Sequence, residues 1–535
     1  MPCSTPSSSS LAPLGPLSRR RFLGLTAGLS VAPLATLLPG CGGSGGTAVG
    51  PETLFEHGVA SGDPRDDSVI LWTRLSPDAE GGIDVEWEVA SDEGFGSIVT
   101  SGTAVTDAER DFTVKIDAAG LEPGSTYYYR FQALGRTSPT GRTRTAPAAG
   151  VQHLRFAVVS CSSLGHGYFH GYRRIAERDD VDAVIHVGDY IYEYGDGEYG
   201  GVRGYEPPHE IVTLDDYRLR YSQYRRDPDL QELHRLFPMI AIWDDHEAAD
   251  NSWRNGAVNH QPETEGPWAE RLATAERVYA EWMPIRDQGD DGKIWRSLRF
   301  GDLVDLLLLD TRLWARDEQT DSTADPIVRD PARQLLGSDQ EAWFASELQA
   351  STARWRIVGQ QVMLGPLKLS GAPNSEGGGT TVNPDQWDGY LAARACFFET
   401  VRASQRDNLV VLTGDIHTSW AIELTDDPNE PSAYDPATGA GAIGVEFVTT
   451  SITSPGISGV DNALIPVFQA ANPHIKWADL ERRGYMILDV TPERTQAAWF
   501  HFDRIDDPVD FTETFARALA VYDGETLLRE ETQPA

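Results

Sequence analysis

Apolar and polar residues alternate along short segments near the start of the chain. Val69–Thr73, Ile83–Val89 and Phe112–Ile116 each place apolar side chains on one face, as half-buried strands do, and turn residues separate these segments. No helical periodicity interrupts the pattern. We therefore predict that residues 52–148 form a β-sandwich domain.

Beyond residues 147–150 the pattern changes to near-continuous apolar strands that alternate with helical stretches. Strands of this kind predict sheets covered on both faces, and so an α/β layered core over residues 152–510, followed by a C-terminal extension over 511–535. In such folds functional residues lie beyond the carboxyl ends of the strands. The predicted buried strands are 154–159, 183–187, 239–243, 306–309, 355–358 and 409–412.

The first 41 residues have the layout of an export signal. The basic patch Arg19–Arg21 precedes an apolar run from Phe22 to Leu38, and no acidic residue occurs before Glu52. Glycines and a proline break the run, whereas a membrane-spanning helix needs about 20 apolar residues in sequence. The paired arginines followed by Phe-Leu resemble a twin-arginine signal, which implies the twin-arginine export machinery as a partner.

Leu38–Cys41 resembles a bacterial lipobox, with Cys41 as the lipidated first residue of the mature chain and residues 42–51 as a Gly/Ser tether behind it. Pro39 is unusual in the middle of a lipobox, so cleavage without lipidation is the alternative. Two acyl groups would anchor the protein stably, and this lipid would be its only contact with the membrane. We therefore predict a periplasmic or cell-surface location.

The charge balance limits the partners of the protein. The chain has 45 Lys and Arg against 81 Asp and Glu, a formal net charge of −36. Such a field repels nucleic acid and anionic lipid, so we expect no nucleic-acid binding. It also repels a phosphate ester, unless bound cations reverse the sign of the charge locally.

Polar residues that could bind metal or phosphate directly follow five of the predicted strands. Each block alone has a structural explanation, such as a helix cap or a buried thiol. Five blocks at the ends of strands are harder to dismiss, because the fold would bring them to one crevice. The blocks are Ser160–Ser162, Gly188–Tyr192, Asp244–Glu247, Gly359–Gln361 and Gly414–His417.

These residue types suit the hydrolysis of a phosphate ester. Two cations a few Å apart lower the pKa of a water molecule, clamp the phosphate oxygens and neutralise the leaving alkoxide. Carboxylates bridge such ions, while histidine, tyrosine and thiolate complete a site for Fe³⁺, and Asp or Asn oxygens suit Ca²⁺. We predict metal-dependent hydrolysis of phosphate mono- or diesters by attack of metal-bound hydroxide.

The order of the blocks resembles that of the calcineurin-like metallophosphoesterase superfamily. Its Gly-Asp-x-x-Tyr motif is matched by Gly188–Tyr192, whereas Asp244–Glu247 and Gly414–His417 depart from its other motifs. These departures resemble the motifs of the PhoD-type alkaline phosphatase and phosphodiesterase family. The presence of Cys161, and of Gln361 in place of a later histidine ligand, adds to this resemblance. The resemblance implies a four-layer metallophosphoesterase sandwich behind an immunoglobulin/fibronectin-like domain. Residues 121–129 resemble the tyrosine corner that is characteristic of such a domain.

The resemblance also implies Fe³⁺ and Ca²⁺ as cofactors and assigns roles to individual residues. Tyr221 or Tyr224 could replace Tyr192 as the tyrosine ligand, and His474 is a candidate for the pocket rim. The assigned residues are Cys161, Asp189, Tyr192 and Asp415 as iron or bridging ligands, Asp245 and Asn251 as calcium ligands, and Asp244, His246 and His417 as catalytic residues.

Other readings of the sequence remain. The family also covers phospholipase D-like phosphodiesterases, and a non-enzymatic anchored surface-binding lipoprotein would explain the N-terminus and the β-sandwich but not the strand-end blocks. The Gly-x-Ser-x-Gly of a serine hydrolase occurs only at residues 42–46, in the tether. A zincin needs a second histidine four residues after His246, where Asp250 stands.

Overall fold

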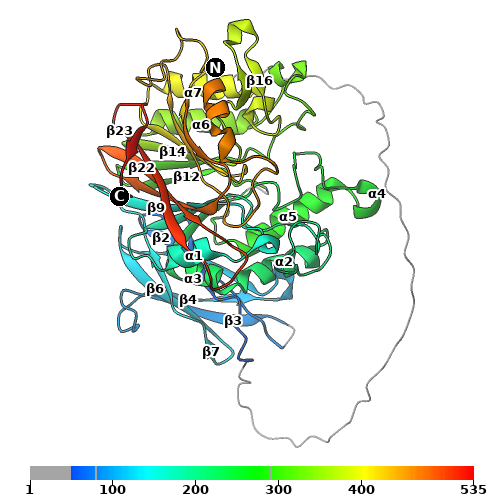
Figure 1. Cartoon of the computed structure of the whole chain (residues 1–535). Coiled ribbons are helices and arrows are strands. Elements are labelled where there is room, and N and C mark those ends of the chain that lie inside the picture. Colours follow the sequence, from blue (N-terminus) through cyan, green and yellow to red (C-terminus); the bar gives the residue numbers. More distant parts are fainter. Residues whose placement is uncertain (1–49, 79–80, 290–291, 535) are drawn as a thin grey trace, which may run out of the picture.

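The structure is a computed structural model of the whole chain and describes residues 50–78, 81–289 and 292–534 (Figure 1). The predicted export signal, Cys41 and most of the tether lie outside the described residues. Within the described ranges, no helix is long and apolar enough to cross a membrane.

Ten strands of the described residues form one large sheet, in which β9, β10 and β11 run parallel to one another. The strands at one edge come from residues 511–535, which we predicted as an extension, so this segment completes the sheet. In spatial order the strands are β24 (Arg529–Glu531), β23 (Glu513–Tyr522), β22 (Arg494–Phe502), β21 (Arg483–Val490), β9 (Leu154–Val159), β10 (Ala183–Val187), β11 (Pro238–Ile242), β1 (Val59–Gly62), β2 (Ser68–Arg74) and β5 (Thr113–Ala119).

A second sheet of seven strands packs against the first, and its parallel core is β13, β14, β17 and β19. A small hairpin, β15 (Lys368–Gly371) and β16 (Gly379–Thr381), lies apart from it. The seven strands are, in spatial order, β12 (Arg296–Phe300), β13 (Val304–Leu308), β14 (Trp355–Gly359), β17 (Leu409–Thr413), β19 (Gly444–Val448), β18 (Ser419–Leu424) and β20 (Ile475–Asp479).

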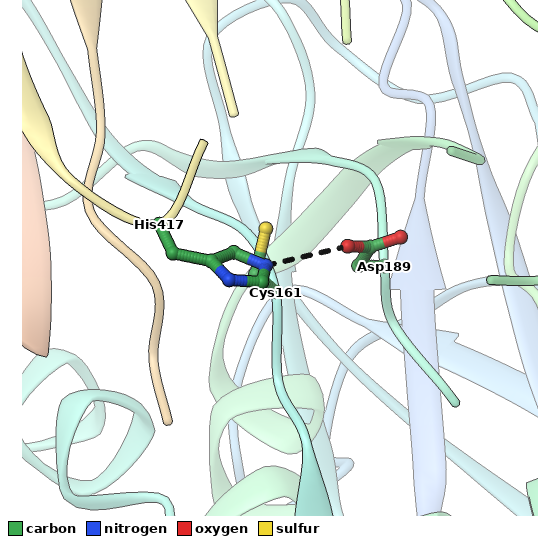
Figure 2. A group of neighbouring side chains, drawn as sticks. All are labelled: Cys161, Asp189 and His417. Atoms are coloured by element: carbon green, nitrogen blue, oxygen red, sulfur yellow. Dashed lines mark ion pairs between the residues drawn. The ribbon is translucent and has the colours of Figure 1, made fainter. Parts of the chain in front are cut away.

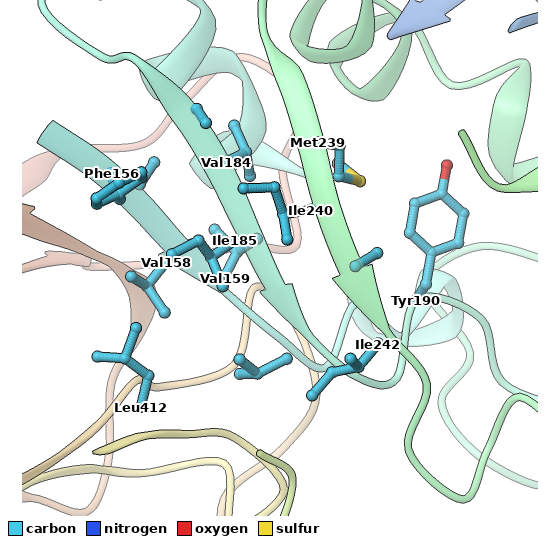
Figure 3. Close-up of a cluster of buried hydrophobic side chains, with 14 of the residues drawn as sticks. Phe156, Val158, Val159, Val184, Ile185, Tyr190, Met239, Ile240, Ile242 and Leu412 are labelled. Carbon is cyan, nitrogen blue, oxygen red and sulfur yellow. The ribbon is translucent and has the colours of Figure 1, made fainter. Parts of the chain in front are cut away.

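Side chains along the strands of the second sheet point alternately to its two faces and so contribute to two different hydrophobic cores. Leu306 and Leu412 pack toward the first sheet, in the core that Figure 3 shows with Val158 of β9, whereas Leu307 and Val411 face the opposite side. Because successive side chains of a strand point to opposite faces, one sheet can be buried on both sides. Helices cover that opposite side of the second sheet and the outer side of the first. The predicted four-layer sandwich is confirmed.

Most of the helices in the described residues pack on one of the two large sheets. Helices α1, α2, α3 and α5 pack on the first sheet and α6 and α7 on the second, while α8 packs on the small hairpin and on β20. The helices are α1 (His170–Ala176), α2 (Leu214–Arg225), α3 (Pro228–Leu236), α4 (Pro262–Glu265), α5 (Trp268–Trp282), α6 (Ser338–Ala350), α7 (Leu391–Ser404) and α8 (Ile465–Ala471).

The N-terminal β-sandwich is present, and it shares a sheet with the rest of the molecule. Its strand β1 pairs in parallel with β11, and β2 and β5 continue the large sheet beyond it. The hydroxyl of Tyr127 accepts a hydrogen bond from the Glu122 amide at 2.8 Å, which forms the expected tyrosine corner. The separate sheet of the sandwich contains β4 (Ile98–Thr106), β3 (Ile83–Ala90), β6 (Thr126–Ala133), β7 (Arg136–Thr137) and β8 (Gly141–Arg144).

Candidate metal centre

The two sheets bring the predicted strand-end blocks to one place. Strands β9, β10 and β11 are neighbours in the first sheet, and β14 and β17 are neighbours in the second. The chain turns sharply as it leaves these strands, and several site residues adopt the left-handed backbone conformation that non-glycine residues rarely take, a form of strain concentrated at functional sites. Their φ angles are 57° for Cys161, 57° for Asp189, 52° for Asn251, 62° for Asp415 and 60° for His417.

One end of the centre combines a thiol, a carboxylate and an imidazole. Ligand atoms of Cys161, Asp189 and His417 lie within 4.8 Å of one another (Figure 2). Cys161 is fully buried and Asp189 is 2% exposed. His417 Nδ1 donates to the carbonyl of Pro455 at 2.7 Å, so its Nε2 faces Asp189, 3.9 Å from Oδ2. A histidine fixed in this way presents an acceptor nitrogen, as a metal ligand does.

Tyr192 belongs to the same end of the centre. Its hydroxyl donates to Asp189 Oδ2 at 2.9 Å and lies 3.3 Å from His417 Nε2. The alternatives lie on α2: Tyr224 accepts a hydrogen bond from the Leu164 amide, and Tyr221 packs its ring on other aromatic rings while its buried hydroxyl has no hydrogen-bond partner among the described residues. Among the three tyrosines, contact with the predicted ligands therefore favours Tyr192.

The other end of the centre is rich in carboxylates. Asp244, Asp245 and Asp415 form one group of ligand atoms within 4.8 Å, and Asp189, Asp245 and His246 form another. Asp189 and Asp245 thus link the two ends. Asn251 reaches the group through its backbone amide, which donates to Asp245 Oδ2 at 2.5 Å.

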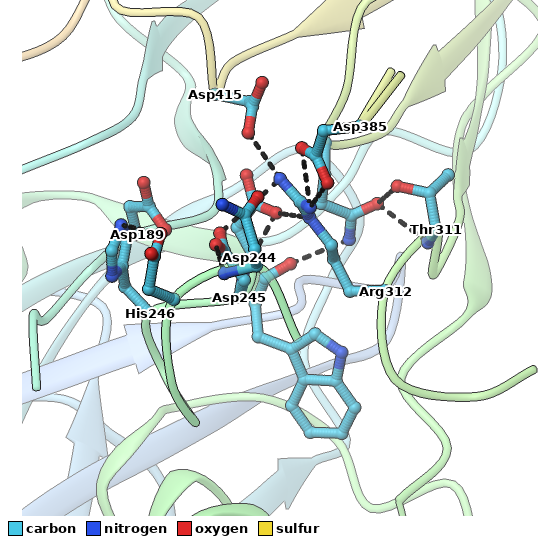
Figure 4. A network of polar contacts seen from close by, with 12 residues as sticks. Asp189, Asp244, Asp245, His246, Thr311, Arg312, Asp385 and Asp415 are labelled. Carbon is cyan, nitrogen blue, oxygen red and sulfur yellow. Dashed lines mark hydrogen bonds and ion pairs between the residues drawn. The ribbon is translucent and has the colours of Figure 1, made fainter. Parts of the chain in front are cut away.

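A buried guanidinium lies among these carboxylates (Figure 4). Arg312 is 1% exposed and forms ion pairs with Asp244 and Asp415. It also binds both oxygens of Asp385, at 2.8 and 2.9 Å, and lies 3.5 Å from Asp245 Oδ1. Asp385 also forms an ion pair with the buried Arg316, so the four acids share two arginines, and the remaining negative charge suits additional cations.

A buried glutamate, Glu193, holds the imidazole of His246. Its Nδ1 lies 2.7 Å from Oε2 of Glu193, which also accepts hydrogen bonds from the Asp250 amide and the Asn259 side chain. Burial disfavours the imidazolium, but the charges of Glu193 and Asp245 outweigh it and raise the pKa of His246 well above its ordinary value. These charges therefore favour the imidazolium form of His246.

The polar atoms of the centre fit bound metal ions. Asp189 Oδ1 and Asp244 Oδ2 are buried without a hydrogen-bond partner among the described residues, which is costly for a carboxylate. Burial, together with the charge of Asp189, raises the pKa of the Cys161 thiol well above its usual range. Cations at these atoms would compensate both effects, because metal ligands bind in their deprotonated form.

Two other residues singled out in the sequence, His474 and Gln361, make contacts that differ from those expected. His474 is fully buried and hydrogen-bonds the carbonyl of Pro366, so its assignment to the pocket rim is wrong. Gln361 stands in the fourth block, but its amide is occupied by Thr311 and by the carbonyls of Trp243 and Leu309. Its role in the structure is to tie strand ends together.

Sequence reasoning missed Arg312, Asp385 and Glu193 as parts of the site. The search for polar residues after strand ends, which identified the other blocks, could also have identified Arg312, because it follows the end of β13 by four residues. Glu193 directly follows Tyr192 and could have been included in that block. Asp385 lies at the end of a long loop, and nothing in its local sequence marks it.

A layered α/β fold with a buried acidic centre at its strand ends suits a metal-dependent hydrolase of phosphate esters. Comparison with known proteins then gives the family. The profile of the PhoD-like phosphatase family matches residues 156–499, and that of its N-terminal domain matches residues 43–147. Alkaline phosphatase D of Bacillus subtilis (strain 168) is 38% identical over 478 residues, 85% of this chain and 78% of the relative.

A solved structure of PhoD resembles the fold with a TM-score of 0.82 and 35% identity, covering 92% of this chain and 94% of the other. The chain belongs to the PhoD-like phosphatase family. It is therefore an enzyme, a phosphoric ester hydrolase, and the resemblance noted in its motifs is confirmed.

Proposed function

We propose that this enzyme is an alkaline phosphatase that depends on Fe³⁺ and Ca²⁺ and acts outside the cytoplasm. The observation that carries the metal dependence is the pair of ligand groups that share Asp189, one with Cys161 and one with Asp245, together with the unpaired carboxylate oxygens beside them. No set of hydrogen bonds within the described residues satisfies those oxygens. The name of the Bacillus subtilis relative supports the choice of alkaline phosphatase.

The two ends of the centre suit different ions. Cys161, Tyr192 and His417 offer the thiolate, phenolate and imidazole that favour iron. Asp245 and Asp415 offer carboxylate oxygens that favour calcium, so we assign Asp415 to the calcium side rather than to iron. Asn251 contacts this side through its backbone amide. Asp189 belongs to ligand groups at both ends and would help to hold both ions. Bound cations would lower the pKa of a water molecule and neutralise the charge on the phosphate.

The side chains of the enzyme provide orientation and proton transfer. His246 carries a proton that Glu193 stabilises, so it can protonate the alkoxide that leaves the phosphate. Arg312 holds Asp244 and Asp415 in place through ion pairs, and Asp244 orients it in turn. Burial of the whole centre strengthens these electrostatic interactions.

Substrate scope is tested by comparing rates. Purified enzyme loaded with iron and calcium should hydrolyse phosphate monoesters, and the ratio of kcat/KM for a monoester and its matched diester will separate a phosphatase from a phosphodiesterase. Absence of turnover with both, in a folded protein that has its metals, would contradict the proposed function.

The location outside the cytoplasm rests on residues 1–41. Replacing Arg20 and Arg21 by lysine should retain the protein in the cytoplasm of the producing cell, as judged by fractionation. Replacing Cys41 by serine should release an exported protein from the membrane fraction. Export that is unaffected by the paired arginine substitution would contradict the twin-arginine pathway.

A further inference from the structure

A cavity of about 580 Å³ lies between strand β5 and helix α5. Thr113 and Lys115 line it from β5, two positions apart, so their side chains lie on the same face of the strand. None of the described residues that line it belongs to the ligand groups of the metal centre. Sites for small molecules have volumes of about 300–1,000 Å³, so this cavity is large enough for such a ligand.

Helix α5 presents one of its faces to the cavity. The residues of this face follow the spacing i, i+3, i+4 and i+7, which places side chains along one side of a helix. They are Ala273, Glu276, Arg277 and Ala280. The alanines at the two ends of this face have small side chains, which leaves the space between the helix and β5 open.

The base of the cavity is apolar. Trp243 and Tyr279 line it with their rings edge to face, 5.1 Å apart, and Ile285 and Ile294 lie beside them. All four side chains are buried. A ligand with an apolar body would gain free energy by leaving water and packing on these residues.

The charged residues around the cavity are mainly basic, although the chain as a whole carries a net charge of −36. One of the lining acids, Glu281, is already neutralised by ion pairs with Arg218 and Arg277. A local excess of positive charge attracts anions. The basic lining residues are Arg110, Lys115, Arg277, Arg286 and Lys293, and the acidic ones are Glu276, Glu281 and Asp287.

Lys115 has the charge that this cavity leaves uncompensated. Its ammonium donates to the carbonyl of Ala280 and forms no ion pair with a described residue. An ammonium has three N–H donors, so Lys115 can also donate to a ligand in the cavity. Burial lowers the pKa of Lys115 to about 8, and an anionic group beside it would stabilise its charged form.

We propose that this cavity binds a small organic anion, whose apolar body packs on Trp243 and Tyr279 and whose carboxylate accepts a hydrogen bond from Lys115. The exposed Arg110, which forms no ion pair with a described residue, adds positive charge to the wall of the cavity. The site is separate from the metal centre, where bound cations would hold the substrate. The inference is therefore independent of the proposed function.

The test compares two ligands that differ in charge. 2-Naphthoate and 2-naphthamide share one ring system and have nearly the same shape, and titration calorimetry of the whole protein measures the affinity of each. The naphthoate should bind the wild-type protein about 10-fold more tightly than the amide. Lys115→Met should weaken naphthoate binding by about 10-fold and leave the amide nearly unchanged.

A second variant tests the place of binding. Ala280→Phe fills the cavity from an exposed position of α5 and should weaken the binding of both ligands. Arg406→Met, an exposed arginine outside the cavity, should change neither affinity. Equal affinities of the two ligands for the wild-type protein, or the absence of binding, would overturn the proposal. Binding of naphthoate that neither Lys115→Met nor Ala280→Phe weakens would place the ligand elsewhere and would overturn it too.

Discussion

Nδ1 of His246 lies 2.7 Å from Oε2 of Glu193, and both side chains are buried beside the candidate metal centre. This pair gives the histidine an orientation and a raised pKa. A histidine used as a general acid at alkaline pH needs such a partner, because its ordinary pKa of about 6.5 would leave it deprotonated.

Replacing Glu193 by glutamine should therefore impair catalysis at high pH. Loss of the carboxylate charge lowers the pKa of His246, so the imidazolium is lost at a lower pH and the alkaline limb of the kcat profile moves in the same direction. We expect kcat at alkaline pH to fall by at least about 10-fold. The exposed Glu177→Gln serves as the control. An unchanged alkaline limb would rule out His246 as the general acid.

Arg312 should be critical for stability as well as for the site. Arg312→Met leaves Asp244 and Asp415 buried without their cation, whereas Asp385 keeps its ion pair with Arg316, and breaking a buried ion pair on one side costs about 3–5 kcal/mol. Denaturant unfolding of the metal-free protein measures this loss. Arg254→Met, which removes an exposed pair with Asp317, should cost no more than about 1 kcal/mol. Equal effects of the two substitutions would contradict the role assigned to Arg312.

These residues also show how far the sequence predicts the structure. Local alternation and strand-end position were sufficient to identify Asp189, Asp245 and His417 as candidate site residues, because the end of a buried strand fixes where the next side chain lies. His474 was a candidate for the rim only through the motif resemblance, and a histidine in a polar loop motif carries no sign of burial. The ion pair of Arg312 with Asp385 joins residues 73 positions apart, and no local pattern reports such a contact.

Domain boundaries were predictable only in part. The change in pattern near Pro147 marks the end of the β-sandwich strands, but the pairing of β1 with β11 depends on tertiary structure. Residues 511–535 contain alternating apolar positions in β23, but these became interpretable only beside β22, with which they pair. Edge strands of a sheet gain their stability from such pairing rather than from their own sequence.

Calcium removal should abolish turnover reversibly. Oxygen ligands such as Asp245 and Asp415 exchange Ca²⁺ readily, whereas thiolate and phenolate retain Fe³⁺. EGTA should stop hydrolysis and added Ca²⁺ should restore it, with Mg²⁺ a poor substitute because it demands a tighter octahedral geometry. Full activity after exhaustive EGTA treatment would refute the calcium assignment.

Asp189 should be the most damaging single ligand to lose. It occurs in both the thiol group and the carboxylate group of ligand atoms, so one side chain serves both ends. Asp189→Asn keeps the volume but removes the charge, and both metals should be lost together. Elemental analysis of the folded variant measures this, with the exposed Asp321→Asn as control. Loss of one metal alone would show that Asp189 does not bridge.

The metal content of Cys161→Ser is the most direct test of the central claim, that a metal centre built around Cys161 supports phosphate ester hydrolysis. Wild-type protein should contain about one iron per chain, and folded Cys161→Ser should lose both the iron and the activity. Cys396→Ser, on helix α7, should retain both. A fully active wild-type enzyme without iron, or a Cys161→Ser variant that keeps its iron, would contradict this account.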